Sequence, residues 1–220
     1  MFRQVFDPEN LFWRIISRGV DVVGLSLFWL VLCLPVVTIG PATAALYYTI
    51  VKVFRHKADD ATFTVFWRAF RSNLRKGVVV TLICIIPSAL LCYGYAVMRA
   101  NVQTSMGVVM FVAYYFALVI PAGLLCYLFP LMGRFEFSVG NLFRTAFMLA
   151  LRHLPSTFVV VLITLELTVF TLERWFPVLV TPVLGVLLVS LFLERIFPKY
   201  LNEEETAKLN DRPLEDETED

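Results

Sequence analysis

The stretch Leu34–Tyr48, which reads LPVVTIGPATAALYY, connects two apolar runs, 20–37 and 39–54, that are together too long for one membrane crossing. A membrane-spanning helix needs about 20 mostly apolar residues. Pro41 has no N–H group and Gly40 tolerates a positive φ, so a helix that continued through both would lose hydrogen bonds that lipid cannot replace. The sequence therefore predicts a turn at this Gly-Pro pair, buried in protein and closely packed against a neighbouring span. It separates two crossings, or one crossing from a re-entrant segment.

The composition is that of an integral membrane protein. Of the 220 residues, 59% are hydrophobic and 17% are charged, whereas a soluble domain has about 45–50% apolar and about 25% charged residues. The net charge of +1 conceals an acidic C-terminal segment, because residues 203–220 carry nine acidic and two basic side chains, a net charge of −7. Such a charge excess predicts a disordered tail.

The expected fold class is all-α: a polytopic membrane helical bundle of about six transmembrane helices, with amphipathic helices at the cytoplasmic interface. Residues 1–202 form the membrane domain. Its predicted spans are about 20–37, 39–54, 78–98, 106–132, 156–171 and 176–197. A five-span alternative makes 20–54 a single crossing.

Amphipathic helices are predicted before three of these spans. The first is short and opens at Asp7 and Pro8, which suit a helix N-cap and first turn. The second, at 62–76, has the clearest helical periodicity. Its aromatic face is Phe63, Phe66, Trp67, Phe70 and Leu74, and its basic face is Arg68, Arg71 and Arg75. The aromatic face is expected to pack on lipid or on the bundle. The third, at about 141–154, repeats the pattern FxxAFxxxLR of the second, which raises the alternatives of an internal repeat and of chance in a Phe-rich chain.

Basic residues predict the orientation in the membrane. With six spans, 17 of the 19 Lys and Arg residues lie on the side of both termini, and only Arg99 and Arg174 lie on the other. The positive-inside rule places the richer side in the cytoplasm. We therefore expect both termini and the loops 55–76 and 134–154 to be cytoplasmic.

One carboxylate, Glu166, lies well inside a predicted span. An acidic residue at the centre of a membrane helix costs about 2.5–3.5 kcal/mol, so it needs compensation. Glu166 is therefore predicted to face the bundle interior or a partner and not lipid. Arg99 and Arg174 are the candidate ion-pair partners.

Enzyme chemistry is not expected from this sequence. His56 and His153 have no second ligand at metal spacing, and no nucleophile elbow, P-loop or zincin pattern occurs. The four cysteines lie in apolar runs without CxxC spacing, which argues against a disulfide framework. No cofactor, metal or nucleic-acid partner is predicted.

The quoted stretch, the basic aromatic helix after it and FPLMGRFE at 129–136 resemble the YesL family, small bacterial membrane proteins of uncharacterised biochemistry. The resemblance covers the chain up to about Leu201 and leaves out the acidic tail. It implies a multi-pass protein of the cell membrane of a Gram-positive bacterium, associated with carbohydrate ABC importers and their sensor kinases. It implies no catalytic residues.

The expected function is that of a non-enzymatic membrane accessory or assembly subunit, with lipids and an ABC importer permease as partners. A small secondary transporter and a membrane regulator coupled to a sensor kinase are the alternatives. The residues singled out for structure or interaction are Pro35, Thr38, Gly40, Pro41, Phe66, Trp67, Arg68, Phe70, Arg71, Arg134, Glu136 and Glu166.

Overall fold

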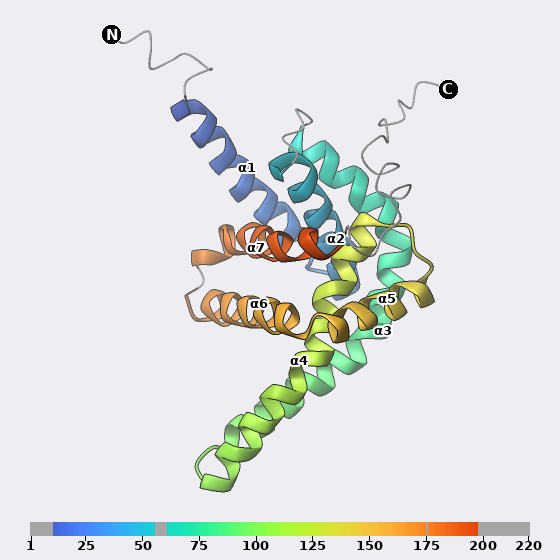
Figure 1. Ribbon diagram of the computed structural model, residues 1–220. Coiled ribbons are helices and arrows are strands. Elements are labelled where there is room, and N and C mark those ends of the chain that lie inside the picture. The colour runs from blue at the N-terminus through green and yellow to red at the C-terminus, as the bar shows by residue number, and fades with distance from the viewer. Residues whose placement is uncertain (1–10, 56–60, 175, 198–220) are drawn as a thin grey trace.

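Helices account for the elements of the computed structural model, which describes residues 11–55, 61–174 and 176–197 (Figure 1). They are α1 Leu11–Leu32, η2 Val36–Thr38, α2 Ile39–Thr49, the π-helix η3 Ile50–Arg55, α3 Thr62–Ala100, α4 Ser105–Arg134, α5 Val139–Arg152, α6 Leu154–Arg174, η4 Phe176–Leu179 and α7 Thr181–Ile196. The described residues contain no strand, so the predicted all-α class is confirmed. The helix start predicted at Asp7 and the acidic tail, 203–220, lie outside the described residues.

Helix α2 lies at the centre of the bundle. It is rich in Gly and Ala, and small residues let neighbouring helices approach closely. Its buried residues are Gly40, Pro41, Ala42, Ala44, Ala45, Leu46, Tyr47 and Thr49. One side of α2 shares an apolar cluster with α1 and α3, and the other side shares a cluster with α4, α5 and α7. The second half of the stretch Leu34–Tyr48 therefore lies in the helix around which the others pack.

The break between α1 and α2 lies slightly before its predicted position. It covers Cys33 to Thr38, while Gly40 and Pro41 belong to the first turn of α2. Proline is tolerated there because the first N–H groups of a helix have no partner within the helix. Gly40 and Pro41, where the buried turn was predicted, are buried, whereas the observed break is exposed at residues 34–36. Residues 20–54 therefore form two helices, of which one, Val36–Val53, is long and apolar enough to cross a membrane, as the five-span alternative requires of this region.

The described helices provide fewer candidate crossings than the six predicted. Three are long and apolar enough to cross a membrane: Val36–Val53, Thr62–Ala100 and Ser105–Arg134. The count rises to four if α5 and α6, which meet at a bend of 103°, together form one broken span. The apolar part of α1 begins at Gly19 and α7 has 16 residues, so both are shorter than the roughly 20 residues of a full crossing. The difference arises because α1 and α7 are short, and because α6 meets the length requirement only together with α5.

Helix α3 joins two elements that the sequence separates. The predicted amphipathic helix 62–76 and the predicted span 78–98 form one helix of 39 residues, with no break at Gly77. At about 1.5 Å per residue, this helix is roughly 58 Å long, well beyond the 30 Å or so of the hydrocarbon core. Of the predicted aromatic face, Phe66 and Phe70 pack on the bundle, whereas Phe63 and Trp67 are exposed.

The outer halves of α3 and α4 form a two-helix arm that extends away from the other helices (Figure 1). Within the arm, the Tyr114 hydroxyl donates to the Leu91 carbonyl at 2.7 Å, and the rings of Tyr95 and Phe111 lie 5.9 Å apart. At its tip, the side chain of Thr104 accepts a hydrogen bond from the Gly107 N–H and caps α4. These contacts are internal to the arm.

Helices α5 and α6 differ from α3 despite the shared pattern FxxAFxxxLR. Both alanines, Ala69 and Ala146, are buried, but Phe70 is buried whereas Phe147 is 49% exposed. The helix also stops after the pattern in α5, because Pro155 has no N–H to donate to the Leu151 carbonyl and its ring would clash there in a continuous helix. The two segments therefore resemble each other in sequence more than in structure. Beyond the bend, α6 lies beside α7 (Figure 1).

Candidate functional site

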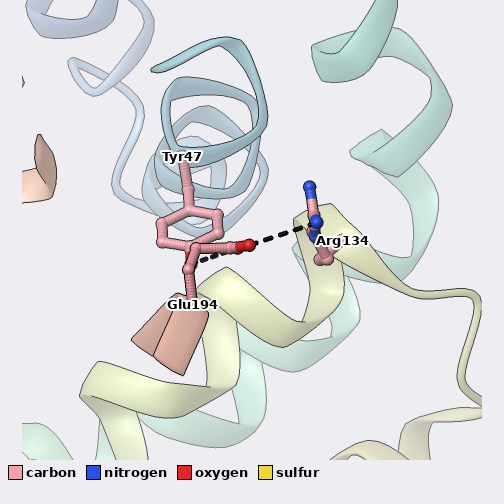
Figure 2. Close-up of polar contacts among 3 residues, drawn as sticks. All are labelled: Tyr47, Arg134 and Glu194. Carbon is pink, nitrogen blue, oxygen red and sulfur yellow. Dashed lines mark hydrogen bonds and ion pairs between the residues drawn. The ribbon is translucent and has the colours of Figure 1, made fainter. Parts of the chain in front are cut away.

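Three polar side chains from α2, α4 and α7 meet at one end of the bundle (Figure 2). The Tyr47 hydroxyl donates to Glu194 Oε1 at 3.0 Å, and Arg134 Nη2 lies 3.1 Å from Glu194 Oε2. The side chains of Arg134 and Glu194 are 13% and 9% exposed, and Tyr47 is fully buried. We call these three residues the polar cluster.

Helix ends explain why the charges lie where they do. Arg134 is the last residue of α4, where a cation is favoured by the partial negative charge of a helix C-terminus. Glu194 lies in the last turn of α7, where an anion is disfavoured, and the Arg134 guanidinium offsets this effect. The rings of Phe135 and Phe197 lie 5.7 Å apart, and that of Phe197 lies 6.5 Å from the Tyr47 ring, so the cluster borders the apolar core.

The polar cluster can stabilise the packing of α2, α4 and α7 against one another. Each carboxylate oxygen of Glu194 has its own partner, one a charged group and the other a hydroxyl. Removing one partner of a buried ion pair costs about 3–5 kcal/mol, because the remaining charge stays buried without compensation. Among the described residues, no group of three or more His, Cys, Asp and Glu side chains could hold a metal ion.

A second site of close contact lies at the start of α2. The Gly40 N–H donates to Thr81 Oγ1 at 3.2 Å, and a Cβ on Gly40 would overlap that oxygen and lie 2.9 Å from Phe129. Next to it, a Cβ on Gly77 would lie 2.7 Å from the Pro41 Cβ. The prediction that Gly40 packs tightly against a neighbouring span is confirmed, and the neighbours are α3 and α4.

The other two residues of the motif stabilise the break itself. The Thr38 hydroxyl lies 2.5 Å from the Leu32 carbonyl and 2.7 Å from the Pro35 carbonyl. Pro35 is extended, with φ −76° and ψ 117°, and precedes the 3-10 turn η2. The threonine hydroxyl can thus donate to the Leu32 carbonyl, which the end of α1 leaves without a partner in the helix, while the Pro35 carbonyl also accepts from the Thr38 N–H.

The predicted aromatic and basic faces of the second amphipathic helix have different surroundings. Phe66 and Phe70 are buried in the cluster between α1, α2 and α3, and the Phe66 ring lies 5.3 Å from that of Phe28. Trp67 is 40% exposed, and the Arg71 guanidinium lies over its ring at 5.4 Å. Arg68 is exposed. The helix therefore anchors α3 to the bundle with its phenylalanines and presents its arginines outward.

The two predicted acidic site residues lie outside the polar cluster. Glu136 is exposed, two residues beyond the cluster's Arg134. Glu166 is exposed on α6 and makes no ion pair with Arg99, Arg174 or any other described residue. Its predicted position in the bundle interior is wrong, because α6 turns its Thr157, Val160 and Val161 face inward. A partner outside this chain remains the other half of that prediction.

Sequence analysis selected Arg134 but missed its two partners. Glu194 lies in the last turn of the predicted final span. An acidic residue so close to an apolar run indicates that a cation lies nearby, and this was the signal in the sequence that could have identified Glu194. Tyr47 lies in the motif that decides the fold, but nothing in its spacing indicates a partner 147 positions away.

Comparisons with known proteins give one match, to a family in the first half of the chain. No curated protein and no solved structure matches the chain. The family match covers residues 22–95, which include the α1–α2 break, all of α2 and most of α3, but not Arg134 or Glu194. Residues 22–95 match the family described as "Protein of unknown function, DUF624".

Proposed function

We propose that this protein is a non-enzymatic accessory or assembly subunit of the membrane, which docks on another membrane protein. The observation that carries the proposal is the arm of α3 and α4, which extends beyond the other helices (Figure 1). Large apolar side chains are exposed along both of its helices. They include Ile86, Leu90 and Tyr93 on α3, and Val109, Val112 and Phe116 on α4.

An extended two-helix arm offers a long contact surface at little cost in conformational freedom. Its internal contacts hold the two helices together before any partner arrives, so docking need not order the chain. Packing of side chains drives association between membrane helices, since lipid provides no hydrophobic force between them. The exposed tyrosine and phenylalanine side chains offer large contact areas for such packing.

The resemblance to the YesL family supports a carbohydrate ABC importer permease as the partner, and the DUF624 match supports that resemblance over residues 22–95. The excess of basic residues around 55–76 and 134–154 supports cytoplasmic termini in a bacterial cell membrane. Lipids cover those parts of the arm that the permease leaves free.

Co-purification from the native membrane tests the proposal. The tagged protein is compared with an arm variant, Leu90→Ala/Tyr93→Ala, and with a control, Phe147→Ala, which changes an exposed aromatic residue on α5. Permease subunits quantified by mass spectrometry should accompany the parent and the control, and fall about tenfold or more with the arm variant. A solitary, monodisperse oligomer in all three samples would contradict the proposal.

A secondary transporter is the second candidate, and the buried polar cluster together with the break between α1 and α2 favours it. Transporter sites often combine discontinuous helices with buried charged groups. Sugar or ion uptake into vesicles containing only this protein, lost in Glu194→Gln, would support this alternative. The regulator alternative rests on the YesL resemblance, and a sensor kinase among the co-purified proteins would favour it.

A further inference from the structure

The outward face of α6 carries a carboxylate in an otherwise apolar stripe. Thr157, Val160 and Val161 are buried against the bundle, and the Thr157 hydroxyl lies 3.2 Å from the Tyr127 hydroxyl and 3.0 Å from the Ala150 carbonyl. Further along the same inward side, the Thr164 hydroxyl lies 3.8 Å from the Cys126 thiol. The opposite side of the helix is a stripe at the spacing i, i+4, i+7, i+11: Val159, Ile163, Glu166 and Phe170. We call it the α6 stripe.

Nothing in the described part of the chain compensates the Glu166 charge. The two basic residues predicted on its side of the membrane, Arg99 and Arg174, do not pair with it. Arg174 lies eight residues further along α6, about 12 Å along the helix axis. An acidic side chain that faces lipid is costly, and such residues usually pair with another group. The missing partner therefore has to come from outside the described bundle.

We propose that the α6 stripe binds a transmembrane helix of a different protein, which places a Lys or Arg side chain opposite Glu166. This inference rests on the proposed function and names the chemistry of its partner. Charge complementarity identifies the occupant, because a carboxylate in apolar surroundings is best compensated by a cation that also donates hydrogen bonds. The apolar members of the stripe have the spacing of a helix-packing seam, and one polar residue in such a seam sets the register of the partner.

A second copy of this chain does not provide the cation. The apolar parts of the described helices, 19–51, 78–98, 106–133, 155–173 and 176–194, contain no Lys or Arg. Two copies meeting through the α6 stripe would instead bring two Glu166 carboxylates together, which disfavours their ionised forms. The partner is therefore a helix of another sequence.

Model helices test this inference without knowledge of the natural partner. The purified full-length protein, labelled with a donor dye, is placed in vesicles of phosphatidylcholine and phosphatidylglycerol. The probes are acceptor-labelled Leu/Ala transmembrane peptides whose central residue is Lys, Leu or Glu. Energy transfer should show about tenfold tighter association with the Lys peptide than with the Leu peptide, the size expected of one interhelical polar contact.

Three variants make the result specific. Glu166→Leu should lose the preference for the Lys peptide, and Glu166→Lys should prefer the Glu peptide. Thr168→Leu, a change at an exposed neighbour, should leave the preference intact. Circular dichroism and size-exclusion chromatography verify that each variant is folded. An unchanged preference in Glu166→Leu, equal binding of the Lys and Leu peptides to the parent, or self-association that Glu166→Leu abolishes would each overturn the inference.

The two proposals fail in different ways. If Glu166→Leu co-purifies permease as well as the parent does, the proposed function stands and the α6 stripe is not the contact. If the parent prefers the Lys peptide but recovers no permease from native membranes, the stripe recognises a cationic helix and the named importer partner is wrong.

Discussion

Replacing Arg134 with Met should destabilise the protein strongly, because it leaves the Glu194 carboxylate buried without its cation. Glu194 is 9% exposed, so water can replace the guanidinium only in part. Loss of one partner from a buried pair costs about 3–5 kcal/mol. Taking the lower end, about 3 kcal/mol, the equilibrium constant for unfolding should rise roughly a hundredfold, at about 1.4 kcal/mol per factor of ten.

The double variant Arg134→Met/Glu194→Leu should be more stable than Arg134→Met alone. It removes both charges, and apolar replacements of a buried pair are often neutral. The Tyr47 hydroxyl then loses its hydrogen bond to Glu194, and a hydrogen bond to a charged group contributes about 1.5–3 kcal/mol. We therefore expect the double variant to recover part of the loss, and Tyr47→Phe/Arg134→Met/Glu194→Leu to recover more.

Reversible unfolding in mixed dodecylmaltoside and dodecylsulfate micelles, followed by circular dichroism, measures these differences. Arg195→Met is the matched control, because Arg195 is the exposed neighbour of Glu194 on α7. Its effect should stay below about 0.5 kcal/mol, as is usual for surface changes. If Arg134→Met unfolds like Arg195→Met, or if the double variant is the less stable of the pair, the polar cluster does not fasten the helices.

Three further predictions concern packing and orientation. Gly40→Ala should lower the free energy of unfolding by about 1–3 kcal/mol, because the added methyl group overpacks against α3 and α4. Gly140→Ala, with nothing near its Cβ position, should be neutral in the same assay. Equal effects of the two changes would contradict the close packing at Gly40. Phe66→Ala should cost about 3–5 kcal/mol, as expected for a buried aromatic residue, and Trp67→Ala much less, so similar losses would contradict the burial of the aromatic face. In a cysteine-free background, Asn101→Cys at the arm tip should react with an impermeant thiol reagent from outside the cell and Gly140→Cys only after lysis, and the reverse pattern would invert the orientation.

The parts of the fold that follow from local rules could be predicted from the sequence. Apolar composition and helical periodicity were enough for the all-α class and for α4, whose predicted span 106–132 differs from Ser105–Arg134 by no more than two residues at either end. Proline chemistry indicated a break near Pro41, although proline also suits the first turn of a helix, and the break precedes it. Local rules did not indicate that the helix continues through Gly77, nor that Gly77 packs closely against Pro41 of α2.

The candidate site was harder to predict because its members lie far apart in the chain. Arg134 attracted attention as part of a motif, but Tyr47 and Glu194 come together with it only when α2, α4 and α7 pack. Glu166 was identified from its cost in lipid, which is a local argument. Which side of α6 it faces depends on the neighbours of Thr157 and Val161, and these are set by tertiary structure.

Site-specific photo-crosslinking in living cells tests the docking role most directly. A photoreactive amino acid is placed at Phe116, an exposed position on the arm, and in a second variant at Phe147, an equally apolar exposed position on α5. The proposed function predicts a crosslink from position 116 to a permease of a carbohydrate ABC importer, with little or none from position 147. If position 116 crosslinks only to lipid or to a second copy of this chain, the arm does not dock on an importer, and the central claim is wrong.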